Sequence, residues 1–88
     1  MKYDCGHYIK MAYGNRPQIE ESEICGCYYC ETIMNKEQVE FLEEKDGRYT
    51  GVCPHCGIDS IVTDKGIEAG GEELTLDLLR EIRKKAFW

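Results

Sequence analysis

The clearest hydrophobic pattern lies near the C-terminus of the chain. Apolar side chains recur there at helical spacing and fall on one face: Leu78, Leu79, Ile82 and Ala86. Thr75 stands at the position of an N-cap, and Leu74 with Leu79 can form a hydrophobic staple across the first turn. The pattern predicts an amphipathic helix over residues 75–87.

A second helix is predicted in the middle of the chain. Asn35 can cap a helix, and Gln38 follows three residues later, as in a capping box. Met34 and Val39 supply a hydrophobic staple around the same start. These signals predict a helix over residues 36–44, ended by the Asp-Gly pair that comes after it.

The remaining patterns are shorter. Residues 48–53 and 57–63 each predict a strand, and together they predict a hairpin with the sequence CPHC at its tip. Residues 64–73 contain three glycines and predict a loop. Residues 1–24 form a poorly defined N-terminal segment with a turn at residues 14–17.

Size and charge narrow the class of protein. A chain of 88 residues predicts one domain, residues 1–88, whose small core buries roughly 60 to 65% of the unfolded surface. The net charge of −6 provides no excess of Lys and Arg for phosphates, so nucleic acid is an unlikely partner and a protein partner is favoured. The sequence has no apolar leader and no membrane-length apolar run, which predicts a cytoplasmic protein.

Six cysteines provide the candidate chemistry. Cys27 and Cys30 form one CxxC unit, Cys53 and Cys56 form another, and 22 residues separate the two units. A tetrahedral zinc ion takes four thiolates at about 2.3 Å, and each CxxC turn can supply two of them. A disulfide framework is the alternative, but it fits secreted chains better. The spacing therefore predicts one Zn²⁺ ion bound by these four residues.

Two redox alternatives involve the same cysteines. The stretch CPHCG at residues 53–57 resembles the second metal-binding turn of rubredoxins, which carry iron, although Glu31 stands where their first turn has glycine. CPHC also resembles the active-site tetrapeptide of thioredoxin-like thiol oxidoreductases, in which the first cysteine begins a helix. Here Gly57 and Ile58 come after the motif, and no βαβ pattern precedes it.

The other cysteines and both histidines have less definite roles. Cys25 could replace Cys27 as a ligand or pack beneath the metal, and packing is the simpler expectation. Cys5 and His7 could form an incomplete second site with Cys25. His55 is expected at the exposed tip of its turn. No arrangement of histidine, serine and acid suggests catalysis.

Aromatic and basic residues near the cysteines and the C-terminus also have two interpretations each. Tyr28 and Tyr29 could cover the metal or present an aromatic platform, and the Phe87-Trp88 pair could fold back or meet a partner. Four basic residues of the predicted C-terminal helix can complement the helix dipole or form a docking patch: Arg80, Arg83, Lys84 and Lys85.

The motifs CGCYYC at residues 25–30 and CPHCGIDSIV at residues 53–62 occur together with a helix that ends in two aromatic residues. In these features the chain resembles a group of small bacterial cytoplasmic proteins with a zinc-ribbon-like site, over roughly residues 22 to 88. The resemblance implies a cytoplasmic metal-binding protein and no particular activity. Cys5 and His7 lie outside it.

Together these features predict a small α+β, zinc-ribbon-like domain. We expect a zinc-stapled β-hairpin, a helix between the two CxxC units and a C-terminal helix packed across them. The expected function is that of a zinc-binding structural module that mediates protein–protein interaction. A nucleic-acid-binding zinc ribbon and a rubredoxin-like iron electron carrier are the alternatives.

Overall fold

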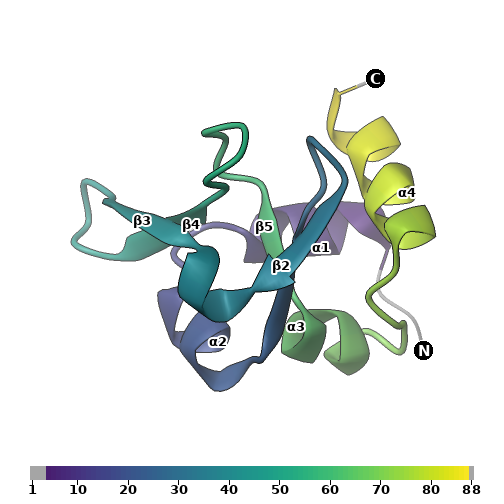
Figure 1. Ribbon diagram of the computed structural model, residues 1–88, viewed down its shortest axis with the longest axis horizontal. Helices are drawn as coiled ribbons and strands as arrows, with labels where there is room; N and C mark the ends of the chain where they lie inside the picture. The colour runs from purple at the N-terminus through teal and green to yellow at the C-terminus, as the bar shows by residue number, and fades with distance from the viewer. Residues whose placement is uncertain (1–3, 88) are drawn as a thin grey trace.

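A computed structural model describes residues 4–87 of the chain (Figure 1). In chain order its elements are α1 (Cys5–Met11), α2 (Arg16–Glu21), β1 (Ile24–Cys27), β2 (Thr32–Asn35), the 3-10 helix η1 (Lys36–Gln38), β3 (Glu40–Glu43), β4 (Tyr49–Val52), β5 (Ile61–Thr63), α3 (Asp64–Ala69) and α4 (Leu76–Phe87). The α+β class predicted from the sequence is confirmed. No helix within residues 4–87 has the length and apolar character needed to cross a membrane.

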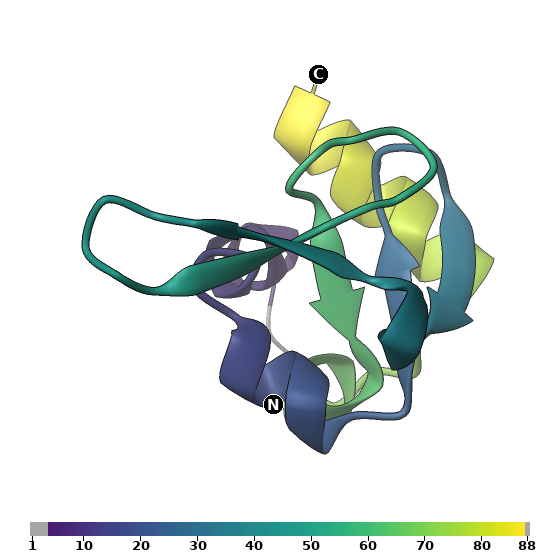
Figure 2. The same cartoon turned by 60° about the vertical axis from the view of Figure 1, so that its left-hand side comes forward.

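The strands form two antiparallel sheets. One has three strands in the order β2-β1-β5, and the other is a ribbon of β3 and β4 alone. Helices α1, α3 and α4 lie around the three-stranded sheet, and the turn of the ribbon extends away from them in both views (Figures 1 and 2). The chain therefore consists of a helix-covered sheet and a projecting ribbon.

The predicted hairpin of residues 48–53 and 57–63 is wrong, because β4 pairs with β3 and β5 pairs with β1. The buried side chain of Asn15 lies between β4 and β5. Its Oδ1 accepts from Gly51 N–H at 3.0 Å, and its Nδ2 donates to the Ile61 carbonyl at 2.9 Å. One side-chain amide thus takes the place of the direct strand pairing that the sequence had suggested.

The predicted helix over residues 36–44 is also wrong. Its N-terminal signal does form, since Gln38 Oε1 accepts from Asn35 N–H at 3.0 Å, but η1 ends after three residues. Val39 is then extended, and β3 pairs with β4 across a turn in which Gly47 has φ 87°. Strand pairing therefore overrides a local start signal for an α-helix.

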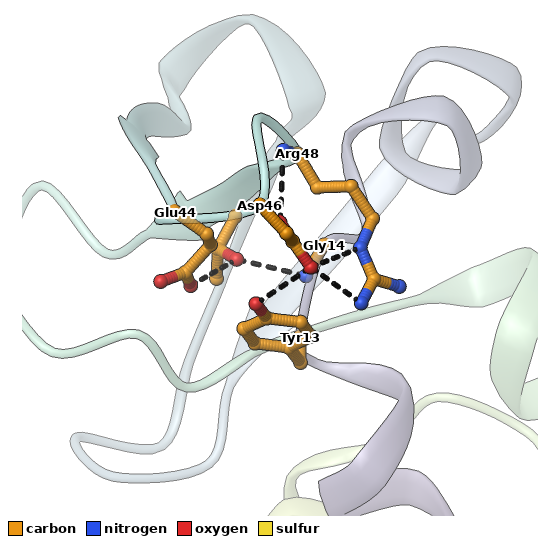
Figure 3. Close-up of polar contacts among 6 residues, drawn as sticks. Tyr13, Gly14, Glu44, Asp46 and Arg48 are labelled. Carbon is orange, nitrogen blue, oxygen red and sulfur yellow. Dashed lines mark hydrogen bonds and ion pairs between the residues drawn. The ribbon is translucent and has the colours of Figure 1, made fainter.

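A group of polar contacts holds the end of the ribbon against the loop after α1 (Figure 3). Tyr13 Oη donates to Asp46 Oδ2 at 3.0 Å, and the Arg48 guanidinium donates to the same oxygen while lying over the Tyr13 ring. Gly14 N–H donates to Thr50 Oγ1 at 2.8 Å. The adjacent guanidinium lowers the pKa of Asp46 to about 2. No pattern in the sequence had indicated this cluster.

Helices also form where no element was predicted. In α3, Thr63 Oγ1 accepts from Gly66 N–H at 2.9 Å and so caps the helix. Gly66 had suggested a loop, but a Cβ atom there would lie 2.7 Å from Gln18 Oε1. This glycine therefore permits close packing of α3 against α2. The poorly defined residues 1–24 contain α1, capped by the Asp4 carboxylate, and α2.

Two hydrophobic clusters form the core. The first is centred on the helices and contains Tyr8, Ala12, Tyr28, Val62, Ile67, Leu79 and Ile82. The second lies beneath the cysteines and contains Ile19, Cys25, Cys27, Met34, Val39, Cys53 and Ile61. The predicted C-terminal helix is confirmed, since Leu79 and Ile82 are fully buried and Thr75 Oγ1 accepts from Leu78 N–H at 3.1 Å.

Candidate metal centre

The four cysteines of the two CxxC units meet at one point. Cys27 ends β1, and Cys30 lies in the turn between β1 and β2. Cys53 comes directly after β4, and Cys56 lies in the connection from β4 to β5. Their four Sγ atoms all lie within 4.8 Å of one another. The β1–β2 turn and the connection from β4 to β5 thus each contribute two sulfur atoms.

The spacing of these sulfurs suits a tetrahedral metal ion. A tetrahedral site with metal–sulfur bonds of about 2.3 Å has sulfur–sulfur edges of about 3.8 Å. The Sγ atoms of Cys27 and Cys56 are 3.6 Å apart, and those of Cys30 and Cys53 are 3.7 Å apart. Within residues 4–87 this is the sole group of three or more His, Cys, Asp or Glu side chains arranged to hold a metal ion.

The two turns, which we call the first knuckle (residues 27–31) and the second knuckle (residues 53–57), share two backbone features. Each ends in a residue in the left-handed region, Glu31 with φ 56° and Gly57 with φ 75°. In each, backbone N–H groups donate to the first sulfur, as from Cys30 to Cys27 at 3.5 Å and from His55 to Cys53 at 3.4 Å. The two knuckles therefore present their sulfurs in similar ways.

Neighbouring hydroxyl groups contact two of the sulfurs. Ser60 Oγ lies 2.9 Å from Cys27 Sγ, and Thr32 Oγ1 lies 3.2 Å from Cys30 Sγ. Burial raises the pKa of Cys27 to about 12. Burial acts in the same direction on Cys30, but hydrogen bonds, first of all that with Thr32, lower the pKa of Cys30 overall. A bound cation favours thiolates, so metal binding at these sulfurs releases protons.

Exposure differs between the two cysteines of each knuckle. Cys27 and Cys53 are fully buried, whereas Cys30 and Cys56 are partly accessible. His55 lies exposed in the second knuckle, as the sequence predicted. Solvent therefore reaches the cluster from the side of Cys30 and Cys56.

The first knuckle is fastened to α4, beside which it lies in Figures 1 and 2. Glu31 accepts from Arg80 Nε at 3.1 Å and forms an ion pair with Arg83 at 3.7 Å. The Phe87 ring meets the Tyr29 ring edge-on at 5.1 Å between centroids. We call these five residues the α4 clamp.

The α4 clamp answers several of the questions left by the sequence. Arg80 and Arg83 were expected to complement the helix dipole or to form a docking patch, but both engage Glu31. Tyr28 is buried in the first hydrophobic cluster, and Phe87 folds back onto both tyrosines. In the sequence, Glu31 stood out only as a departure from rubredoxins. Trp88 lies outside the described residues.

Cys25 and Cys5 are separate from the four-cysteine cluster. Cys25 is fully buried in the second hydrophobic cluster, and burial together with Asp64 raises its pKa to about 12. Cys5 packs against the other hydrophobic cluster, and burial raises its pKa as well. The structure therefore groups Cys27, not Cys25, with the other three sulfurs, and within residues 4–87 it does not join Cys5, His7 and Cys25 into a second site.

The chain was compared with protein-family models, curated proteins and solved structures, and none of the three comparisons finds a match. Any function of the chain is therefore inferred from the geometry of the four-cysteine cluster.

Proposed function

We propose that the protein is a zinc-binding structural module. Cys27, Cys30, Cys53 and Cys56 would hold one Zn²⁺ ion. The observation that carries this proposal is the convergence of their Sγ atoms within 4.8 Å at near-tetrahedral spacings. The burial of Cys27 and Cys53 adds support, because it limits access to the ligands.

A structural role is favoured over a catalytic one by the donor set. Four thiolates complete a tetrahedral zinc site, whereas catalytic zinc keeps one position for water or substrate. The ligands come from the two knuckles, so a bound ion would join the three-stranded sheet to the ribbon. Structural zinc contributes on the order of 10 kcal/mol to the folding of small domains. We therefore propose that metal binding stabilises the arrangement of the two sheets.

Variants of two neighbouring cysteines test the ligand assignment. Cys25 and Cys27 are both fully buried residues of β1, but Cys25 lies outside the cluster of four sulfurs. We expect Cys27→Ser to lose zinc in native mass spectrometry and Cys25→Ser to retain one ion per chain. Equal loss of zinc in both variants would refute the assignment.

Iron is a second candidate for the same sulfurs, because four thiolates accept both metals. One observation favours it: Glu31, which stands where rubredoxins have glycine, adopts a left-handed backbone conformation that glycine favours. A rubredoxin-like electron carrier would be red after expression with ample iron and would have a reversible reduction potential. Colourless protein with one zinc ion would decide against this function.

A protein partner in the cytoplasm is proposed for the module. The net charge of −6 favours such a partner over nucleic acid. The engagement of Arg80 and Arg83 by Glu31 further weakens a nucleic-acid surface on α4. A salt-titrated binding assay with DNA and RNA tests this, and tight binding at low salt would favour the nucleic-acid alternative.

A further inference from the structure

The β3–β4 ribbon has one closed edge and one open edge. On the β4 side, Gly51 N–H is bonded to the Asn15 side chain, and α2 packs alongside. On the β3 side, all four residues from Glu40 to Glu43 are exposed. Two strands alone form a marginal sheet in water, and a third strand stabilises it.

The register shows which backbone groups of β3 face outward. Glu44 N–H donates to the Arg48 carbonyl at 2.7 Å, so the alternate residues Leu42 and Glu40 direct their backbone groups toward β4. Phe41 and Glu43 therefore direct their backbone N–H and C=O groups away from β4, toward the open edge. Gly51, the partner of Phe41 in the register, likewise directs its backbone groups out of the ribbon, because its N–H points away from β3 and donates to Asn15.

These outward groups are available for pairing. Within residues 4–87, the backbone N–H and C=O groups of Phe41 and Glu43 have no backbone partner beyond the ribbon. The side chains of Phe41 and Leu42 are 37% and 39% exposed. An added strand could thus gain both main-chain hydrogen bonds and apolar contacts, which is how peptides join exposed sheet edges.

The charge around this edge indicates the chemistry of its occupant. Residues 37–44 contain four glutamates and no lysine or arginine. The nearest basic groups are mostly engaged: Lys36 donates to the Glu20 carbonyl, Arg16 pairs with Glu20 and lies over the Phe41 ring, and Arg48 pairs with Asp46. Lys45, in the turn, is exposed. The edge as a whole is acidic and complements a basic segment.

We propose that the open edge of β3 binds an extended, basic segment of a partner protein as an added strand. This inference rests on the proposed function and deepens it by naming the surface and the class of partner. A second copy of the chain is disfavoured as occupant, because pairing two β3 edges would bring glutamates into proximity with glutamates, and like charges across strands are destabilising. Acidic side chains thus prevent self-pairing while selecting a basic strand.

The test is an NMR titration of the full, ¹⁵N-labelled, zinc-loaded chain with a blocked peptide in which lysine and valine alternate. We expect the largest shifts along β3, with new protection from hydrogen exchange at the Phe41 and Glu43 amides but not at Leu42, which is already bonded to β4. Glu43→Pro removes one outward N–H without touching the β3–β4 ladder, and should weaken binding about tenfold. Glu43→Gln, the matched control, keeps the N–H and should weaken it less.

Control peptides separate strand pairing from simple charge attraction in the unmodified protein. A lysine–valine peptide N-methylated at every amide keeps its charge but cannot donate a main-chain hydrogen bond from either edge, and we expect it to bind much more weakly. Equal binding of this peptide would overturn the proposal, as would shifts centred on β2. Dimerisation through β3 at rising protein concentration would also overturn it. Metal content is measured on the same sample, so failure of the zinc module and failure of the β3 edge are distinguished.

Discussion

At the scale of single residues, Glu31 combines an unfavourable backbone with favourable side-chain contacts. A left-handed conformation costs a non-glycine residue roughly 1–2 kcal/mol. The Glu31 carboxylate, only 23% exposed, is paired with Arg80 and Arg83. The residue that departs from the rubredoxin pattern thus adopts the backbone a glycine would adopt, and also binds α4 to the first knuckle.

Two substitutions of Glu31 separate these effects. Glu31→Ala keeps the left-handed backbone and removes the carboxylate, so it should lower the free energy of unfolding by about 0.5–1 kcal/mol. Glu31→Gly loses the same contacts but relieves the strained backbone conformation, and should be about 1 kcal/mol more stable than Glu31→Ala. Urea denaturation of the zinc-loaded variants measures both values. A less stable glycine variant would show that the backbone of Glu31 is not strained.

The lowered pKa of Asp46 predicts a small dependence of the folding stability on pH. Hydrogen bonds from Arg48 lower the pKa of Asp46 from 3.8 to about 2 in the folded protein. The contribution of Asp46 is therefore present above pH 3.8 and is lost as the pH falls through about 2. Asp46→Asn should reduce the slope of stability against pH in this range, measured by thermal melting. An unchanged slope would contradict the role of the cluster in Figure 3.

At the scale of elements, the position of the ribbon depends on Asn15. Its amide satisfies a backbone donor of β4 and a backbone acceptor of β5, and it is buried. Asn15→Ala leaves both groups without this partner and should lower the free energy of unfolding by about 2 kcal/mol. Asn35→Ala, which removes a capping residue at an exposed site, should cost less, about 0.5–1 kcal/mol. Similar values for the two variants, measured in urea, would refute the bridging role of Asn15.

Local signals in the sequence were sufficient for some elements. The helix near the C-terminus was predictable because its cap at Thr75 and its buried face at Leu79 and Ile82 lie within the same segment. The two CxxC units were predictable as one cluster for a similar reason, since each pair is formed by one turn. That the four cysteines bind a metal ion, that the ion is zinc and that the module has a protein partner all stay predictions.

Other elements depend on contacts that are distant in the sequence. Asn35 and Gln38 do begin a turn of helix, but pairing of β3 with β4 decides the conformation of the residues after it. The hairpin of β4 and β5 fails because Asn15, 36 residues before Gly51, lies between these strands. The α4 clamp joins Glu31 to a residue 49 positions later. No local pattern predicts such contacts.

At the scale of the whole molecule, the four sulfurs lie where the two sheets meet. Each sheet is small, and the second hydrophobic cluster lies beneath the sulfurs. A metal ion at this point would hold both knuckles and, through the α4 clamp, the C-terminal helix. We therefore predict that metal loss loosens the sheets and α4 together.

The coupling between the metal site and α4 predicts how the folded protein responds to a fall in pH. Metal binding requires thiolates, and burial raises the pKa of Cys27 and of Cys53, so protons compete strongly with the metal. Zinc affinity should fall as the pH falls, with loss of zinc and of the near-ultraviolet circular dichroism of Tyr28 and Tyr29 in one transition. Loss of zinc without a spectral change would show that the metal does not support the α4 clamp.

The central claim is best tested by native mass spectrometry of the folded chain combined with a count of alkylatable thiols. Since Cys25 is fully buried and Cys5 is partly accessible, we predict one zinc ion and modification of Cys5 alone. A metal-free folded chain, with Cys27, Cys30, Cys53 and Cys56 freely alkylated or paired in disulfides, would contradict the claim.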